Sequence, residues 1–307
     1  MTTRAPQLRV NKVAKGSHRP MPLGILMIFP SLGLIAALFI LPIGIALRDS
    51  FFNVNTISGD RIWVGLSNFA WVLTSADIRE AFLRSLIYCI VSVGCEVTLA
   101  VLISNLLRTR FRGQGFVRAL IIAPYVIPTI IVVLIWRFLL EPSLGVLNLM
   151  LKQFDLVQTT PAWLGDPGLA FPIAIVVTIW KYTPFMVILM TARLQSVPTE
   201  LYEAVSIDGG GAWSRLRYVT VPWLAPVIGI SVAVRAILSL NEFDLLYLLT
   251  GGGPQGSSTT VPLLVREEAF AALDSGRASA IAIAMAFFVL AVVAVIYLLI
   301  RRRQRKS

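Results

Sequence analysis

Six long apolar runs, separated by shorter polar segments, dominate the pattern of hydrophobic and polar positions along the chain. A helix needs about 20 residues to cross a hydrocarbon core of roughly 30 Å. Runs of that length occupy residues 23–47, 83–107, 117–140, 169–193, 223–250 and 278–300. Because a bilayer offers no water to satisfy backbone amides, such runs span it as helices. The pattern therefore predicts an all-α, polytopic membrane protein with six transmembrane helices.

Composition and charge agree with this prediction. The chain has 307 residues, of which 57% are hydrophobic and 14% charged, and its mean hydropathy of +0.79 lies outside the soluble range. The net charge of +11 is concentrated in residues 1–20, 108–118, 215–217 and 301–307, which a six-span chain places on one side. The positive-inside rule makes that side cytoplasmic, with both termini. The charge thus indicates membrane topology, and we expect no nucleic acid partner.

This topology also predicts the division of the chain. We expect a basic cytoplasmic tail at residues 1–20, a transmembrane domain at residues 21–300 and a second basic cytoplasmic tail at residues 301–307. A polar elbow at residues 194–222 interrupts the transmembrane domain on its cytoplasmic side.

Residues typical of catalysis or metal binding are sparse. His18 is the only histidine and lies in the basic tail, while Cys89 and Cys95 stand six residues apart on one predicted helix. This spacing suits neither a disulfide nor a metal site. The glycine-rich segment 251–254 lacks the lysine of a phosphate-binding loop. We expect no enzymatic activity, no metal and no cofactor bound by this chain.

Charged residues inside the apolar runs are candidates for function, because a charge in a membrane usually faces the bundle or a cavity. Glu96 lies near the middle of the second run, where either a structural hydrogen bond or a place on a transport pathway would explain it. Arg235, Ser239 and Glu242 share one helical face in the fifth run. Arg235 and Glu242 could form an ion pair of purely architectural value.

Aromatic and hydroxyl residues near prolines form a second group of candidates. Two prolines, Pro124 and Pro128, predict a bend in the third run, with Tyr125 and Thr129 lining it. The fourth run holds a comparable cluster around Pro184. Rings stack on the apolar faces of sugars and hydroxyls bond their OH groups, although packed aromatic core is the alternative for each residue.

The elbow predicts two short helices around a glycine break. Pro198 suits a first helical turn, and the helix is expected to run from about residue 198 to residue 207, where glycines 209–211 end it. Leu201 and Ile207, together with two smaller residues between them, would share an apolar side. The elbow is either an amphipathic element on the membrane face or an ordinary loop.

The elbow resembles the EAA signature of permease subunits of ABC importers. The matching residues are Glu203, Ala204, Gly209 and Pro222, with valines replacing Ala, Ile and Leu at positions 205, 219 and 221. The resemblance implies the type I ABC importer permease fold, in which this elbow is a coupling helix seated in a cleft of a separate ATPase. It assigns ATPase coupling to the following residues: Glu203, Ala204, Asp208 and Gly209.

Other motifs resemble the carbohydrate importers within that group. The segment Leu249–Pro254 reads L-T-G-G-G-P, and with the P-Y-x-x-P segment at 124–128 it resembles the larger permease type of the maltose and glycerol-phosphate importers. The resemblance implies uptake of a sugar, oligosaccharide or polyol across a bacterial plasma (inner) membrane. The implied partners are a second homologous permease, two ATP-binding subunits that use ATP and Mg, an extracytoplasmic binding protein and membrane lipid.

Aligning these motifs also carries over substrate contacts. The implied substrate-binding residues are Tyr125, Thr129, Thr178, Tyr182, Leu238, Ser239 and Glu242. Lys181, Arg235 and Glu242 depart from a neutral sugar lining and leave an anionic sugar or sugar phosphate open. An ion-coupled secondary transporter of a small polar solute is the alternative function, and six spans with an elbow argue against it.

Overall fold

The computed structural model describes residues 22–304 except 56 and 110, so the whole predicted basic N-terminal tail, residues 1–20, lies outside the described residues. The chain divides into two compact units, one ending at Ile45 and the other beginning at Ala46. The first unit holds α1 (Pro22–Ile35), the π-helical segment η1 (Ala36–Ile40) and the start of α2 (Leu41–Asp49). The predicted domain boundaries at residues 20 and 300 stay predictions.

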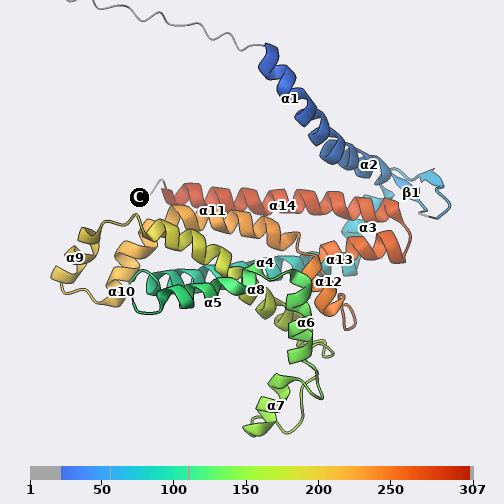
Figure 1. Ribbon diagram of the computed structural model, residues 1–307. Helices are drawn as coiled ribbons and strands as arrows, with labels where there is room; N and C mark the ends of the chain where they lie inside the picture. The colour runs from blue at the N-terminus through green and yellow to red at the C-terminus, as the bar shows by residue number, and fades with distance from the viewer. Residues whose placement is uncertain (1–21, 56, 110, 305–307) are drawn as a thin grey trace, which may run out of the picture. The chain divides into compact units, whose positions relative to one another are not determined.

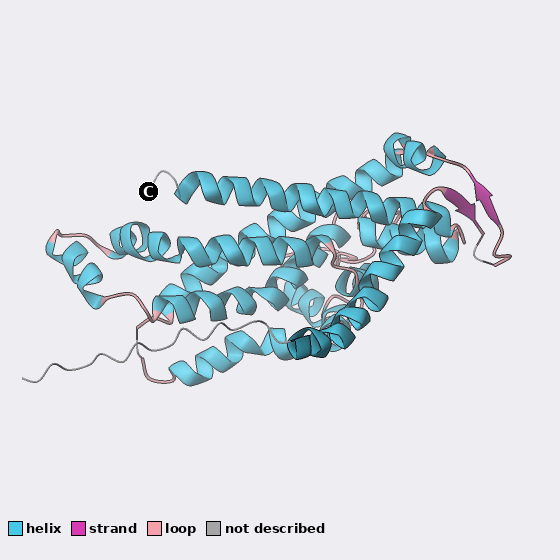
Figure 2. Cartoon of the chain, turned by 90° about the horizontal axis from the view of Figure 1, so that it is seen from above, coloured by secondary structure: helices cyan, strands magenta, loops and turns pink. Residues whose placement is uncertain are grey.

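Four long helices form the body of the second unit. They are α4 (Ala76–Leu106), α8 (Ala170–Leu194), α11 (Val221–Leu240) and α14 (Ser275–Gln304). Figures 1 and 2 show them running lengthwise beside one another, with α4 packed most extensively on α8, and α11 on α4, α8 and α14. Small residues allow the close approach, and the Ser104 hydroxyl of α4 donates to the Val187 carbonyl of α8 at 3.3 Å.

The third predicted span is broken in the middle. It consists of α5 (Gln114–Val126) and α6 (Thr129–Leu139), whose axes differ by 99°. Pro128 has no amide hydrogen to donate, and Ile127 before it is extended, with φ −68° and ψ 131°. The predicted proline bend is confirmed. Among the described residues, five helices are long and apolar enough to cross a membrane, or six if this bent pair counts as one.

The fifth span is shorter at its far end than the apolar run predicts. It was expected at residues 223–250, but α11 ends at Leu240 and a separate helix, α12 (Asp244–Thr250), follows. The Glu242 side chain accepts a hydrogen bond from the Leu245 amide at 3.2 Å and so caps the start of α12. An apolar run does not reveal such a break, because both helices are apolar.

Shorter elements connect these spans. They are β1 (Phe52–Val54), β2 (Arg61–Trp63), α3 (Ser67–Thr74), α7 (Val146–Gln153), α9 (Thr199–Ile207), α10 (Ala212–Arg215), η2 (Leu216–Thr220), α13 (Val261–Arg266) and η3 (Glu267–Ala271). The two strands pair antiparallel, with Phe52 opposite Trp63. In Figure 1, α9 and α10 lie at the same end as the C-terminus of α14, and the hairpin, α3 and α13 lie at the opposite end.

Candidate functional site

A cavity of about 310 Å³ opens among α5, α8, α11 and the start of α12. Its lining residues are Tyr125, Tyr182, Phe185, Arg235, Leu238, Asn241, Glu242, Phe243 and Asp244. The rings of Tyr125 and Tyr182 meet edge to face with centroids 6.5 Å apart, and Phe185 lies 5.9 Å from Tyr125. The prolines position this lining, because the break after α5 leaves Tyr125 41% exposed at its end. Aromatic faces and polar groups thus converge on one space.

The predicted substrate residues divide into two groups. Tyr125, Tyr182, Leu238 and Glu242 line the cavity, whereas Thr129, Thr178 and Ser239 do not.

The residues outside the lining have partners within the protein. Thr178 is fully buried and lies 2.6 Å from the Tyr88 hydroxyl, while Ser239 is 2% exposed and lies 3.2 Å from the Ser92 hydroxyl. Thr129 interacts with the Tyr182 hydroxyl. These three residues support the wall in this conformation, and their contact with substrate stays a prediction.

Arg235 forms a buried ion pair with Glu96. Its Nε donates to Glu96 Oε2 at 2.8 Å and its Nη2 to Oε1 at 2.7 Å, and the two side chains are 2% and 0% exposed. Such a bidentate pair matches the planar guanidinium to a carboxylate. The predicted pairing of Arg235 with Glu242 is therefore wrong, because the helix ends between them and a carboxylate on α4 is closer. Of the two explanations for Glu96, the structure supports the architectural one.

The flat face of the Arg235 guanidinium contacts the aromatic lining of the cavity. Its central carbon lies 4.2 Å from the centroid of the Tyr182 ring, within the range of a cation–π contact. Arg235 thereby links the ion pair in the bundle to the aromatic lining of the cavity.

Lys181 provides a hydrogen-bond donor to the backbone at the break between α5 and α6. Its Nζ donates to the Ile127 carbonyl at 2.9 Å, and the side chain is 4% exposed. A carbonyl released from helical bonding inside a membrane needs such a partner. Lys181 is therefore absent from the cavity lining, a placement that its position in the sequence could not indicate.

Glycines end α9 as the sequence predicted. Gly209 has φ +77°, a backbone conformation that side chains disfavour, and the Gly210 amide donates to the Val205 carbonyl at 2.8 Å. A Cβ atom on Gly210 would come within 2.7 Å of that carbonyl oxygen. The chain can therefore reverse sharply into α10.

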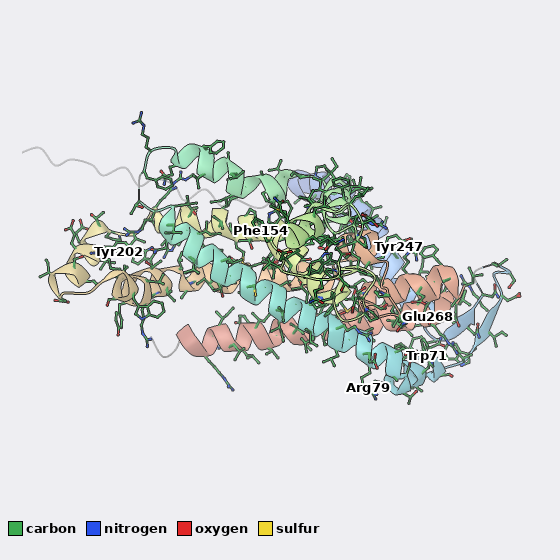
Figure 3. The ribbon with its side chains drawn as sticks, turned by 90° about the horizontal axis from the view of Figure 1, so that it is seen from below. Trp71, Arg79, Phe154, Tyr202, Tyr247 and Glu268 are labelled. Atoms are coloured by element: carbon green, nitrogen blue, oxygen red, sulfur yellow. The ribbon has the colours of Figure 1, made fainter. Side chains whose placement is uncertain are left out.

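The face by which α9 meets the bundle is not its apolar side. Leu201 and Ile207 are 41% and 86% exposed, whereas Tyr202 is only 7% exposed. Figure 3 shows Tyr202 in the elbow, at the end of the unit opposite to Trp71 and Glu268. The apolar side is therefore left largely exposed, and the pattern of a short helix does not reveal which side has a partner.

A small network anchors Tyr202. Its hydroxyl lies 3.1 Å from the Thr220 hydroxyl in η2, and the Arg108 guanidinium lies 3.8 Å from the centroid of its ring. Thr220 in turn donates to Asn105 at the end of α4, at 3.4 Å. One aromatic side chain therefore ties α9 to η2 and to the end of α4, and no motif in the sequence marks it.

The residues assigned to coupling lie on the free surface of the elbow. These exposed residues are Glu203, Ala204, Asp208 and Gly209. Trp213 and Tyr218 nearby are 69% and 68% exposed. Exposed apolar residues rimmed by polar ones are typical of a protein interaction surface. The coupling role of these residues stays a prediction.

Related proteins agree with this architecture. Over 295 residues the chain is 34% identical to the trehalose/maltose transport system permease protein MalF of Thermococcus litoralis, covering 96% of this chain and 99% of that protein. It is 30% identical over 299 residues to the inner membrane ABC transporter permease protein YcjO of Escherichia coli, covering 96% and 98%. It is 28% identical over 282 residues to the sulfoquinovosyl glycerol transport system permease protein SmoG of Agrobacterium fabrum, covering 92% and 91%.

A solved structure shares the fold. In a crystal structure of a bacterial ABC transporter involved in the import of the acidic polysaccharide alginate, one chain superposes with a TM-score of 0.80 at 23% identity, covering 91% of this chain and 95% of that chain. The predicted all-α polytopic permease fold is thereby confirmed. The family described as binding-protein-dependent transport system inner membrane component matches residues 96–306. The chain therefore belongs to this family of ABC importer permeases.

Proposed function

We propose that this chain is one of two permease subunits of an ATP-driven importer, and that its cavity passes a carbohydrate delivered by an extracytoplasmic binding protein. The observation that carries the proposal is the cavity at α5, α8 and α11, where Tyr125, Tyr182 and Phe185 surround polar groups. Aromatic rings stack on sugar faces and polar groups bind hydroxyls. Two relatives are named for trehalose/maltose and sulfoquinovosyl glycerol transport, which supports the substrate class.

The proposed partners follow from the family and from the exposed elbow. A second permease would complete the pathway, and two ATP-binding subunits would use ATP and Mg. The alginate transporter was solved with an alginate pentasaccharide-bound periplasmic protein, which supports an extracytoplasmic binding protein here. The coupling surface around Glu203 and Asp208 would seat against one ATP-binding subunit.

The arginines support an orientation in the inner membrane with both termini in the cytoplasm. Arg215 and Arg217 lie in the elbow, Arg108 contacts Tyr202 of the elbow, and Arg301 and Arg302 lie at the end of α14 near it. Positive residues favour the cytoplasmic side. The elbow would therefore face the compartment that contains ATP.

The structure suggests how motion of the elbow would reach the cavity. Closure of the ATP-binding subunits would displace α9, and Tyr202 would transmit the movement to Thr220 and Asn105. Thr220 immediately precedes α11, which carries Arg235 and Leu238 into the cavity wall. Rigid movement of these spans would alternate access to the cavity, and the substrate would undergo no chemical change.

The proposal is tested with the chain co-purified with the products of its neighbouring genes in nanodiscs. We expect one sugar-loaded binding protein from a panel to stimulate ATP hydrolysis. Changing Glu203→Lys should abolish sugar uptake in cells while the binding protein still binds its ligand. The matched control, Asp60→Lys, makes the same charge change in the exposed hairpin turn and should retain uptake.

Two results would count against the proposal. Normal uptake by the Glu203→Lys variant would remove the elbow from coupling. Uptake driven by an ion gradient, unaffected by deletion of every co-purifying ATPase, would favour a secondary transporter instead.

A further inference from the structure

The charged groups at the cavity differ in whether another charge neutralises them. Arg235 lines the cavity, and its charge is balanced by Glu96, which accepts hydrogen bonds from its Nε and Nη2 and is 0% exposed. Lys181 points to the Ile127 carbonyl and does not line the cavity. Of the two cationic residues that the sequence offered for an anionic substrate, Arg235 is therefore balanced by Glu96 and Lys181 is directed at the broken span.

The acidic residues at the same cavity lack a direct ion pair in the part of the chain that the structure describes. Glu242 and Asp244 both line it, and within the described part of the chain neither forms a salt bridge. The Glu242 carboxylate accepts one bond from the Leu245 amide and interacts with the Tyr182 hydroxyl. The surface that a solute would meet is thus aromatic and negatively charged.

We propose that this cavity admits neutral, polyhydroxylated sugars and rejects sugars that carry a carboxylate, phosphate or sulfonate. The inference rests on the proposed import function and narrows its substrate class. Carboxylates accept strong hydrogen bonds from hydroxyl donors. An anion would lie near Glu242 and Asp244 in surroundings less polar than water, where like charges repel more strongly. The cation among the lining residues, Arg235, already forms an ion pair with Glu96.

The charge of the cavity can be measured without knowing the substrate. In the assembled transporter in nanodiscs, Cys95, which is exposed, is replaced by Ser, and Leu238→Cys places a thiol in the lining. Three methanethiosulfonate reagents of similar size, cationic, neutral and anionic, then compete for that thiol. Each rate is divided by the rate of the same reagent with free 2-mercaptoethanol. We expect the cationic reagent to be favoured over the anionic one by about tenfold, because Glu242 and Asp244 make the net charge of the lining negative.

Matched variants assign the effect to the acidic residues. Glu242→Gln should reduce the normalised ratio by at least about threefold. Asp60→Asn removes a carboxylate from the distant hairpin turn and should leave the ratio unchanged. A ratio near one, or a ratio that Glu242→Gln does not alter, would overturn the inference. Failure of all three reagents at Leu238→Cys and at Phe185→Cys would overturn it too, because the cavity would then admit no solute.

A second measurement separates this inference from the proposed function. Binding proteins loaded with trehalose or with trehalose 6-phosphate are compared for stimulation of ATP hydrolysis by the same nanodiscs. Stimulation by the phosphorylated sugar would contradict charge selection while leaving the import function intact. Absence of stimulation by every loaded binding protein, together with a strong cationic preference at Leu238→Cys, would contradict the import function and leave the cavity charge established.

Discussion

The middle of the bundle buries polar side chains, whereas the elbow exposes apolar ones. In the middle, polar side chains are buried and pair within the chain, as Glu96 does with Arg235 and Tyr88 with Thr178. In the elbow, Ile207 and other large apolar side chains are exposed. An unpaired polar group costs several kcal/mol in apolar surroundings, so polar side chains in the middle of the bundle need partners within the chain. The elbow keeps its apolar surface available for a partner, which is the physical basis of the proposed coupling role.

The largest expected effect comes from breaking the buried ion pair in the middle of the bundle. Changing Glu96→Ala leaves the Arg235 charge buried without its partner, which should reduce the free energy of unfolding by roughly 3–5 kcal/mol. The measurement is the unfolding midpoint of the purified chain in mixed detergent micelles. The control, Glu80→Ala, removes an exposed pair with Arg84 and should cost less than about 1 kcal/mol. Equal losses of unfolding free energy in both variants would contradict the distinction between the buried and the exposed ion pair.

A smaller effect is expected where the elbow is anchored. Tyr202→Leu keeps an apolar side chain but removes the hydrogen bond to Thr220 and the ring beneath Arg108, which together are worth about 2 kcal/mol. We expect more ATP to be hydrolysed per sugar imported, since the elbow would move without displacing the spans. Tyr202→Phe should restore most of the coupling because it retains the ring.

The control for this anchor is Tyr218→Leu, which changes the same residue type at a position 68% exposed. Its ratio of ATP hydrolysed to sugar imported should remain that of the unmodified transporter. If Tyr202→Leu lowers protein yield but leaves the ratio unchanged, the tyrosine stabilises the elbow without transmitting its motion.

The smallest effect on stability is expected on the free surface of the elbow. Trp213 is 69% exposed, so Trp213→Ser should change the free energy of unfolding of the chain by less than about 0.5 kcal/mol. The same change should reduce the amount of ATP-binding subunit that co-purifies, because an apolar contact is lost. A destabilised chain with unchanged co-purification would show that Trp213 packs internally and would remove the contrast between the two regions.

Local features of the site could be predicted from the sequence because they depend on neighbouring residues. The bend at Pro128 follows from a missing amide hydrogen, and the end of α9 follows from the glycines at 209–211. Tyr125 and Tyr182 were predicted to contact substrate, and both line the cavity. The periodicity of the short helix α9 was a poorer guide, since it could not say that Tyr202 would be the buried residue.

The sequence by itself determined the membrane-spanning class of the protein, its broken third span and its glycine-terminated elbow, because hydrophobic length and backbone chemistry are local properties. Only the tertiary structure decided that Arg235 pairs with Glu96, that Lys181 binds the Ile127 carbonyl and that Glu242 is left at the cavity. These pairings join residues as many as 139 positions apart. A charged side chain in a bilayer pairs with a group that helix packing brings close in space, and that group can be distant in the sequence.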